Sequence, residues 1–193
     1  MKKSIAITGG IGSGKSAVLA IIRDMGREVI SADNVNRELL QDRDYLSILE
    51  DNFKEAFPDG VFDKRILADI IFNNDDKRLL LNSIAHKRIK ILVKDKIAIS
   101  KDDFVYVEVP LLVESGMADL FDDIIVVTAD TETKIERVAI RDNISKEDVV
   151  KRIASQLSDA ELLKYATYII NNDCDLGELR CRVELIVKEV ETK

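Results

Sequence analysis

The sequence predicts an α/β fold of three layers, in which helices cover both faces of a doubly wound, five-stranded parallel sheet. Three observations support this prediction. Five short runs rich in Ile, Val and Tyr are apolar throughout, which is typical of parallel strands buried on both faces. Stretches with helical spacing separate these runs. A cluster of glycines directly follows the first run, at the edge where parallel sheets bind ligands.

The expected strands cover residues 4–8, 27–31, 104–109, 123–128 and 167–171. A helix is expected over residues 16–25, because Val18, Ile22 and Met25 fall on one stripe. Gly26 can end this helix in a left-handed cap. Parallel strands joined through helices require right-handed crossovers, which produce the layered arrangement.

Two insertions are expected to interrupt the core. Residues 33–103 contain no strand-like run, and their apolar residues recur at helical spacing, so we expect a helical subdomain at 34–100. A second insertion, 131–155, is expected to hold two helices. Ser145 and Ser158 each stand three residues before an acidic residue, the spacing of a capping box. The core would then comprise residues 1–33, 101–130 and 156–193.

The composition excludes some classes of protein. Of 193 residues, 36 are acidic and 29 are Lys or Arg, and the net charge of -7 argues against general binding to nucleic acid or to an anionic membrane. No apolar run approaches a membrane span, and the first one is too short for a secretion signal, so we expect a cytoplasmic protein. No feature indicates an obligate protein partner. Cys174 and Cys181 match no metal or redox spacing, and we expect both on one helix face as small apolar residues.

The glycine cluster has a defined spacing. GGIGSGKS, residues 9–16, matches G-x-x-x-x-G-K-[ST] in full, between an expected strand and an expected helix. The glycines let backbone N–H groups turn toward an anion, and the start of the helix presents its positive end there. We expect Lys15 to reach the outer phosphates of a nucleotide and the Ser16 hydroxyl to bind Mg²⁺. The residues expected to bind ATP are Gly10, Gly12, Ser13, Gly14, Lys15, Ser16 and Ala17.

Three classes of nucleotide-binding protein share this loop. A GTPase switch needs D-x-x-G and N-K-x-D segments, and neither string occurs. A nucleic-acid motor is usually larger and carries a basic track, whereas this chain is short and acidic. A small-molecule kinase remains. It needs an acceptor-binding subdomain, a lid that carries arginines, and a carboxylate that faces the acceptor hydroxyl.

Each of these parts has a candidate. The acceptor subdomain would be residues 34–100, and the lid would be residues 131–155. In the lid, Arg137 and Arg141 lie four residues apart on one helix face and could stabilise the transferring phosphoryl group, although both could also be solvated surface charges. Asp33, just past the second strand, could accept or orient the acceptor's proton. It could also cap the helix that follows, and the two roles are compatible.

Two further residues carry weaker signals. Glu108 ends the third strand, where a carboxylate could help to position Mg²⁺ or could be an ordinary edge residue. His86 is the only histidine and lies among apolar residues on an expected helix, which favours a structural role.

Several longer segments stand at characteristic distances from one another. After ITGGIGSGKS come ISADNVNREL, DGVFDKRILADIIF, VEVPLLVESG, ERVAIRDNISKEDVVKRIASQ and ATYIINN. The P-L-L-x-E string in the fourth segment and the Arg137, Arg141, Arg152 and Gln156 positions in the fifth are the most specific. Together these segments, which span nearly the whole chain, resemble those of the dephospho-CoA kinase family.

The resemblance implies transfer of the γ-phosphoryl group of ATP to the ribose 3′-hydroxyl of dephospho-CoA, with Mg²⁺, as the last step of coenzyme A synthesis. It implies that Asp33, Lys15 and Arg141 are catalytic. The residues assigned to the acceptor are Asp33, Leu111, Glu114, His86 and Arg137. The chain departs from the family pattern at Ala17, Ser31, Lys64, Lys87 and Thr167.

Two alternatives stay open at this point. One is another small-molecule kinase of the shikimate or gluconate type, whose acceptor region would be shorter and would leave VPLLVESG unexplained. The other is a regulatory nucleotide-binding module with little catalysis of its own. The presence of Lys15, Ser16 and Asp33 argues against that module.

Overall fold

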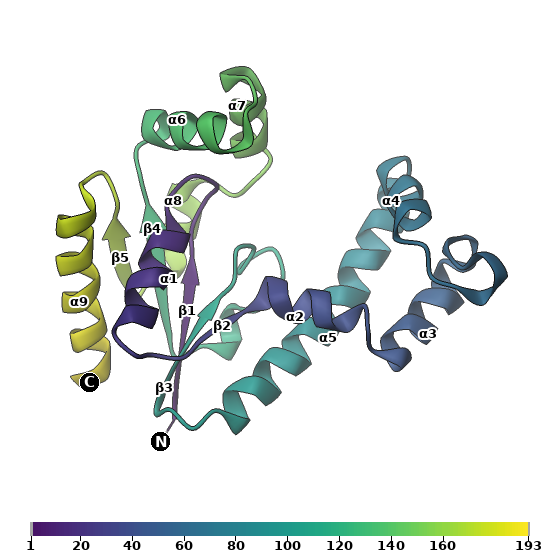
Figure 1. Cartoon of the computed structure of the whole chain (residues 1–193), viewed down its shortest axis with the longest axis horizontal. Coiled ribbons are helices and arrows are strands. Elements are labelled where there is room, and N and C mark those ends of the chain that lie inside the picture. The colour runs from purple at the N-terminus through teal and green to yellow at the C-terminus, as the bar shows by residue number, and fades with distance from the viewer. Residues whose placement is uncertain (1, 193) are drawn as a thin grey trace. The chain divides into compact units, whose positions relative to one another are not determined.

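The computed structural model describes residues 2–192 and is drawn in Figure 1. The described chain forms two compact units. Residues up to Ser31 and from Ile99 onward make one unit, here called the sheet unit. Residues Ala32–Ala98 make the other, here called the helical unit.

The sheet unit is built on five parallel strands, as predicted, and their order is β2-β3-β1-β4-β5. Their bounds are β1 Lys3–Thr8, β2 Val29–Ser31, β3 Phe104–Glu108, β4 Asp123–Thr128 and β5 Tyr168–Asn171. The central strand β1 pairs Ile7 with Glu108 on one side and with Ile125 on the other. Because the strands are parallel, their carboxyl ends share one edge of the sheet.

Strand β2 begins two residues later than expected. Helix α1 (Lys15–Asp24) ends in a left-handed turn, in which Gly26 has φ +78° and donates to the Arg23 carbonyl. The Arg27 N–H then bonds the Ile22 carbonyl at 3.2 Å, which completes a Schellman motif and withholds that donor from the sheet. The expected cap at Gly26 is therefore confirmed, and it shortens the strand.

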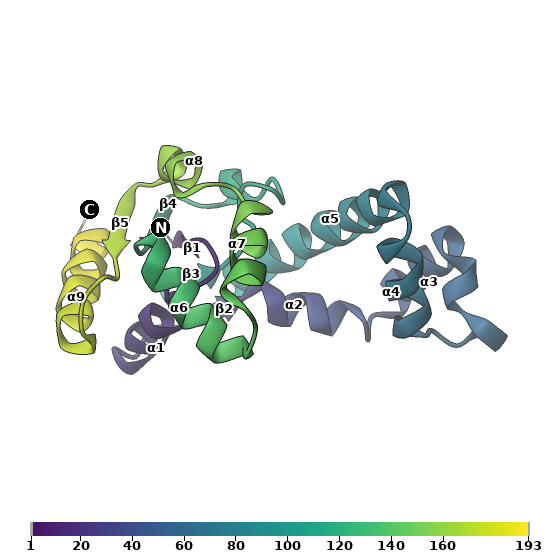
Figure 2. The same cartoon turned by 90° about the horizontal axis from the view of Figure 1, so that it is seen from above.

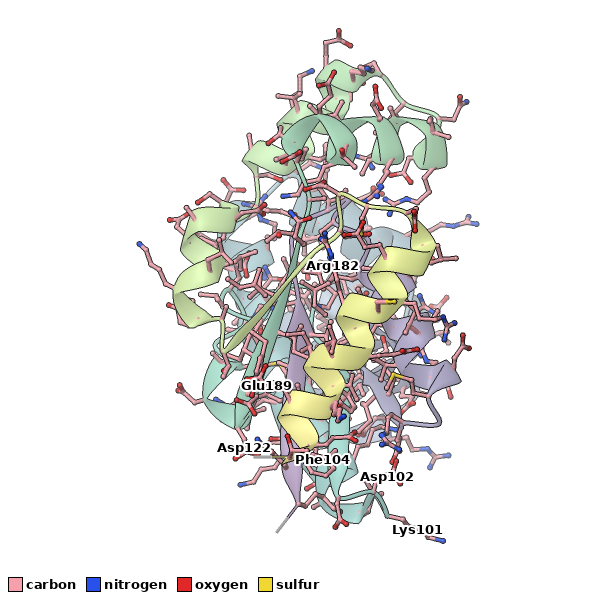
Figure 3. The ribbon with its side chains drawn as sticks, turned by 90° about the vertical axis from the view of Figure 1, so that its left-hand side faces the viewer. Lys101, Asp102, Phe104, Asp122, Arg182 and Glu189 are labelled. Carbon is pink, nitrogen blue, oxygen red and sulfur yellow. The ribbon has the colours of Figure 1, made fainter. Side chains whose placement is uncertain are left out.

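Helices α1 and α9 (Leu176–Thr192) pack on the same face of the sheet, and Figure 3 faces α9. Leu179, Val183, Val187 and Val190 recur at helical spacing along the buried face of α9. Arg182 lies toward one end of this helix in Figure 3, whereas Phe104 and Asp122 mark the amino ends of the strands. Side chains that alternate along a strand point to opposite faces of the sheet. Ala6 and Val107, which neighbour core residues in their strands, are also completely buried, so both faces of the sheet are covered.

Two helices follow β4. Helix α6 (Thr131–Asp142) and helix α7 (Lys146–Ala154) run side by side in Figures 1 and 2. Asn143, with φ +50°, ends α6, and the Ser145 hydroxyl caps α7 by accepting from the Asp148 N–H. We expected a reciprocal capping box at both Ser145 and Ser158. It forms only at Ser158, the N-cap of α8 (Asp159–Leu162). At Ser145 the Asp148 carboxylate accepts from the serine hydroxyl instead.

The helical unit contains α2 (Ala32–Leu39), α3 (Arg43–Asn52), α4 (Lys64–Phe72) and nearly all of α5 (Asp75–Ile99). Asp42 caps α3 and also pairs with Arg88 of α5 at 3.2 Å. These contacts lower the pKa of Asp42, the hydrogen bond from the Tyr45 N–H most of all. The carboxylate therefore fixes the start of α3 against α5.

The expectation for the two cysteines was wrong. Cys174 precedes α9 and is half-buried against the core, whereas Cys181 lies on α9 and is exposed. They do not share a helix face, because α9 begins only at Leu176. Among residues 2–192, no helix has the length and apolar character needed to cross a membrane.

Candidate active site

Residues 9–16, here called the phosphate loop, connect β1 to α1 at the carboxyl edge of the sheet. Gly12 has φ +79° and Gly14 has φ +88°, conformations that favour glycine. A Cβ on Gly12 would lie 2.7 Å from the Lys134 carbonyl oxygen, and one on Gly14 would lie 1.9 Å from Asn172 Nδ2. Both glycines are therefore required by neighbouring segments as well as by backbone conformation.

Side chains from distant segments hold the loop. Gln156 Oε1 accepts the Ile11 N–H at 2.9 Å, and Asn172 Nδ2 donates to the Ser13 carbonyl at 2.9 Å. Lys15 Nζ donates to the carbonyl oxygens of Gly9 at 2.6 Å and Gly10 at 3.1 Å. Contacts from distant segments and from Lys15 thus fix the shape of the loop.

The remaining loop residues have different surroundings. The Ser13 hydroxyl is buried and has no hydrogen-bond partner among the described residues. Ser16, in the first turn of α1, is exposed, as a hydroxyl available to a ligand must be. Ala17 is half-buried, and its side chain packs against the apolar core of the sheet unit. Its expected place in the ATP site therefore involves no more than its backbone.

The two lid arginines have different partners. Arg137 Nη2 donates to the Asn172 carbonyl at 3.0 Å, and its buried Nη1 lies beside Gly14 without a partner among residues 2–192. Arg141 is largely exposed and forms two hydrogen bonds to Asp142. That hydrogen bonding raises the pKa of Arg141 and lowers the pKa of Asp142. Arg152 of α7 also reaches Asp142, at 2.9 Å.

A buried lysine also adjoins the loop. Lys134 of α6 is only 5% exposed and forms an ion pair with Asp159 at the start of α8. A Cβ on Gly10 would lie within 4 Å of Lys134, Asp159 and Gln156 side-chain atoms. The sequence interpretation missed all three as neighbours of the loop, because they follow the motif by more than a hundred residues.

The third strand ends beside β1. Glu108 is half-buried at the carboxyl end of β3, where it pairs in register with Ile7 of β1 and Ser31 of β2. Leu111 and Glu114 lie in the turn that follows, and both are exposed. The edge position of Glu108 agrees with the prediction.

The helical unit contains a cavity of about 380 Å³, here called the Asp33 cavity. Asp33 lies in the first turn of α2 and is exposed, and because the helix begins at Ala32, it does not occupy the N-cap position. The walls are largely apolar and include Tyr45, Leu49, Phe62, Leu67 and Ile71. The polar lining residues are Asp33, Asn36, Arg37, Lys64 and Asn82.

Sequence reasoning missed this cavity apart from Asp33. Its lining comes from α2, α3, α4, α5 and the segments before α3 and before α4, and no spacing rule connects these positions. His86, proposed for the acceptor, is half-buried on α5 and does not line the cavity, although its neighbour Ala85 does.

Among residues 2–192, no three His, Cys, Asp or Glu side chains group in a way that would hold a metal ion. In phosphate-binding sites, Mg²⁺ takes only one or two protein groups as ligands, and the phosphates of the nucleotide supply others. The exposed Ser16 hydroxyl and the Glu108 carboxylate are suitable oxygen donors of this kind.

Comparison with known proteins identifies the family. The family model for dephospho-CoA kinase matches residues 3–178. A dephospho-CoA kinase of Dehalococcoides mccartyi is 35% identical over 196 residues, covering 97% of each chain. The crystal structure of TT1252 from Thermus thermophilus has a TM-score of 0.82 at 29% identity, covering 97% of each chain. A dephospho-CoA kinase from Campylobacter jejuni has a TM-score of 0.73 at 28% identity, covering 98% of each chain. The chain belongs to the dephospho-CoA kinase family.

Proposed function

We propose that this protein transfers the γ-phosphoryl group of ATP to the ribose 3′-hydroxyl of dephospho-CoA, giving coenzyme A and ADP. The observation that carries the proposal is that one chain contains both a complete phosphate loop and a cavity that has a carboxylate, Asp33, in its wall. The first provides the donor site and the second the acceptor site. Family membership supports the choice of both substrates.

On the donor side, the phosphate loop binds the triphosphate through its backbone N–H groups and the amino end of α1. Lys15, now bonded to two loop carbonyls, exchanges these partners for phosphate oxygens. The exposed Arg141 adds positive charge near the transferring group when the segment 131–155 closes as a lid. Closure also excludes water and limits hydrolysis of ATP.

On the acceptor side, Asp33 accepts a hydrogen bond from the 3′-hydroxyl and either takes its proton or orients it. When Mg²⁺ is bound, it neutralises charge on the β- and γ-phosphates. Ser16 and Glu108 are the residues that would hold it. Leu111 and Glu114, in the turn after β3, are the other residues that we assign to the acceptor.

The test is ADP release from ATP and Mg²⁺ in the presence of dephospho-CoA, shikimate, gluconate or no acceptor. We expect turnover only with dephospho-CoA, and a product that is one phosphate heavier than the acceptor. Activity with shikimate or gluconate instead would show that the protein is a kinase but would contradict dephospho-CoA as its acceptor. Tight ATP binding without turnover on any acceptor would point to a regulatory module.

A further inference from the structure

We propose that Asp142 is a positioning residue for phosphoryl transfer, whose carboxylate holds one edge of the Arg141 guanidinium and leaves the opposite edge for the transferring group. Arg152 in turn holds the carboxylate. This inference rests on the proposed function, because it assigns a partner to the arginine that acts on the phosphoryl group there. All three residues belong to the sheet unit, at the junction of α6 and α7.

The contact between Arg141 and Asp142 is made at two points. Arg141 Nε donates to Asp142 Oδ1 at 2.7 Å, and Arg141 Nη2 donates to Asp142 Oδ2 at 3.1 Å. Adjacent residues of a helix ordinarily do not face each other, so these two side chains bend toward one another at the end of α6. Two charge-assisted bonds in such a fork fix the orientation of a guanidinium as well as its place.

The carboxylate is the better supported member of the pair. The side chain of Asp142 is 25% exposed, whereas that of Arg141 is 61% exposed. Arg152 of α7 adds a third bond, from its Nη1 to Asp142 Oδ2 at 2.9 Å. The hydrogen bonding from Arg141 most of all lowers the pKa of Asp142, so this carboxylate stays charged at physiological pH. Asp142 therefore has the charge and the support that are needed to hold a neighbouring cation.

The stability of α6 does not account for an aspartate at this position. Asp142 is the last residue of the helix, where the negative end of the helix dipole disfavours a carboxylate. The helix is closed instead by Asn143, whose N–H donates to the Ala139 carbonyl. Within residues 2–192, Arg141 and Arg152 are the cations that compensate Asp142. The carboxylate is thus matched to these two arginines rather than to its own helix.

The free edge of Arg141 faces no such partner and can serve the phosphates. A guanidinium has five N–H donors, and Asp142 takes two of those of Arg141. Arg141 follows Arg137 on the same face of α6, and Arg137 Nη1 lies 3.6 Å from the position of a Cβ on Gly14. Arg141 therefore stands about 6 Å farther along the helix axis than the residue that borders the phosphate loop.

The test measures phosphoryl transfer and ATP binding in Asp142→Asn, which keeps the shape of the side chain and removes its charge. The matched control is Glu136→Gln, because Glu136 of α6 also forms an ion pair with α7, at 3.5 Å, through Lys146 rather than Arg152. Arg141→Ala and the double variant Arg141→Ala/Asp142→Asn complete a double-mutant cycle. Exchange of the Arg141 Nε–H with solvent is followed by NMR without turnover, and its signal is identified by its loss in Arg141→Ala.

We expect kcat to fall about tenfold in Asp142→Asn, since misplacement of a group at the reacting atoms costs up to about 10²-fold. The Kd for ATP should not rise, because the substitution removes a negative charge. In the Arg141→Ala background, Asp142→Asn should change kcat by less than about twofold, because the residue that it positions is gone. Exchange of the Arg141 Nε–H should become about threefold faster or more. Glu136→Gln should match wild type in each measurement.

Each of the following results would overturn the inference. An unchanged or higher kcat in Asp142→Asn would mean that the carboxylate gives Arg141 no help, or competes with the phosphates for it. A lower kcat with a severalfold weaker Kd for ATP, or an equal loss in the Arg141→Ala background, would mean that Asp142 only supports the structure of the lid.

Unchanged exchange of the Arg141 Nε–H would overturn the inference independently of any activity. The proposed function has a separate criterion, because it fails only if the wild-type protein transfers no phosphate to dephospho-CoA. The exchange measurement therefore distinguishes a failure of the inference from a failure of the proposed function.

Discussion

The phosphate loop and the Asp33 cavity are built in different ways. The loop is eight consecutive residues whose backbone forms the site, and three of its glycines, Gly9, Gly12 and Gly14, meet neighbouring atoms at distances that exclude a methyl group. The cavity is made of side chains from four helices and two connecting segments. A site formed by the backbone tolerates little substitution and leaves a motif in the sequence, whereas a site formed by side chains tolerates more and leaves none.

The sharpest separation of the two sites is expected from Asp33→Asn. Loss of the carboxylate should lower kcat by about 10²–10⁴, the usual contribution of a general base, and should leave the Kd for ATP unchanged. Stopped-flow transfer assays and calorimetry measure the two quantities. Asp51→Asn, which changes an exposed carboxylate of the same unit, is the control. A large loss of ATP affinity in Asp33→Asn would contradict its assignment to the acceptor.

Alanine substitutions at the two lid arginines should change different quantities. Arg141→Ala should lower kcat by about 10², since it removes a mobile cation, with an unchanged free energy of unfolding. Arg137→Ala should raise the KM for ATP and lower the free energy of unfolding by about 1 kcal/mol, because it removes a bond to Asn172 beside the loop. Lys151→Ala of α7 is the control. Equal kcat values for Arg141→Ala and wild type would show that Arg141 is a solvated surface charge with no part in catalysis.

The strictness of the backbone site is tested by Gly14→Ala. The added methyl group meets Asn172 at a left-handed φ, so we expect the Kd for ATP to rise at least about tenfold and the free energy of unfolding to fall by about 1–3 kcal/mol. Gly60→Ala is the matched control, because Gly60 also has a positive φ but has open space around it. Gly60→Ala should lower the free energy of unfolding by about 1 kcal/mol and leave the Kd for ATP unchanged. Wild-type ATP affinity in Gly14→Ala would show that the loop can move aside.

The smallest effect is expected from Lys64→Arg in the cavity. Lys64 is exposed and forms no salt bridge within the described part of the chain, so a different cation can replace it without disturbing a fixed geometry. We expect kcat/KM for dephospho-CoA to change less than about threefold, an energy of under about 0.7 kcal/mol. A much larger loss would mean that this part of the cavity is as strictly shaped as the loop.

The same contrast explains what the sequence could predict. All five strands were recognised, because a buried parallel strand is a continuous apolar run. Strand β2 was predicted two residues too long, because nothing in the composition shows that the Arg27 N–H donates to the Ile22 carbonyl at the end of α1. The cysteine pair was misjudged for a similar reason, because their spacing fits a helix that begins only at Leu176.

Within the site, the loop residues were identified by spacing alone, whereas their supports were not. Asn172, Lys134 and Asp159 contact the loop only after the chain has folded, and single-sequence patterns carry no information on such pairings. Gln156 was noted through the family resemblance, but its bond to the Ile11 N–H was not foreseen. The cavity was equally hidden, because each lining residue is ordinary in its own helix.

The contacts of α6 have a consequence for how the proposed lid can swing. The first half of the helix is anchored, since Lys134 pairs with Asp159, the backbone at Lys134 packs against Gly12, and Arg137 bonds Asn172. Beyond Arg137, Ile140 is 83% exposed and Arg141 contacts only its neighbour Asp142 among the bonds described above. Because α6 is continuous as far as Asp142, this anchorage also holds the backbone of Arg141. We therefore expect lid closure to move α7 about the turn at Asn143, where φ is +50°, and to bring in only the side chain of Arg141, while the floor beneath the nucleotide stays still.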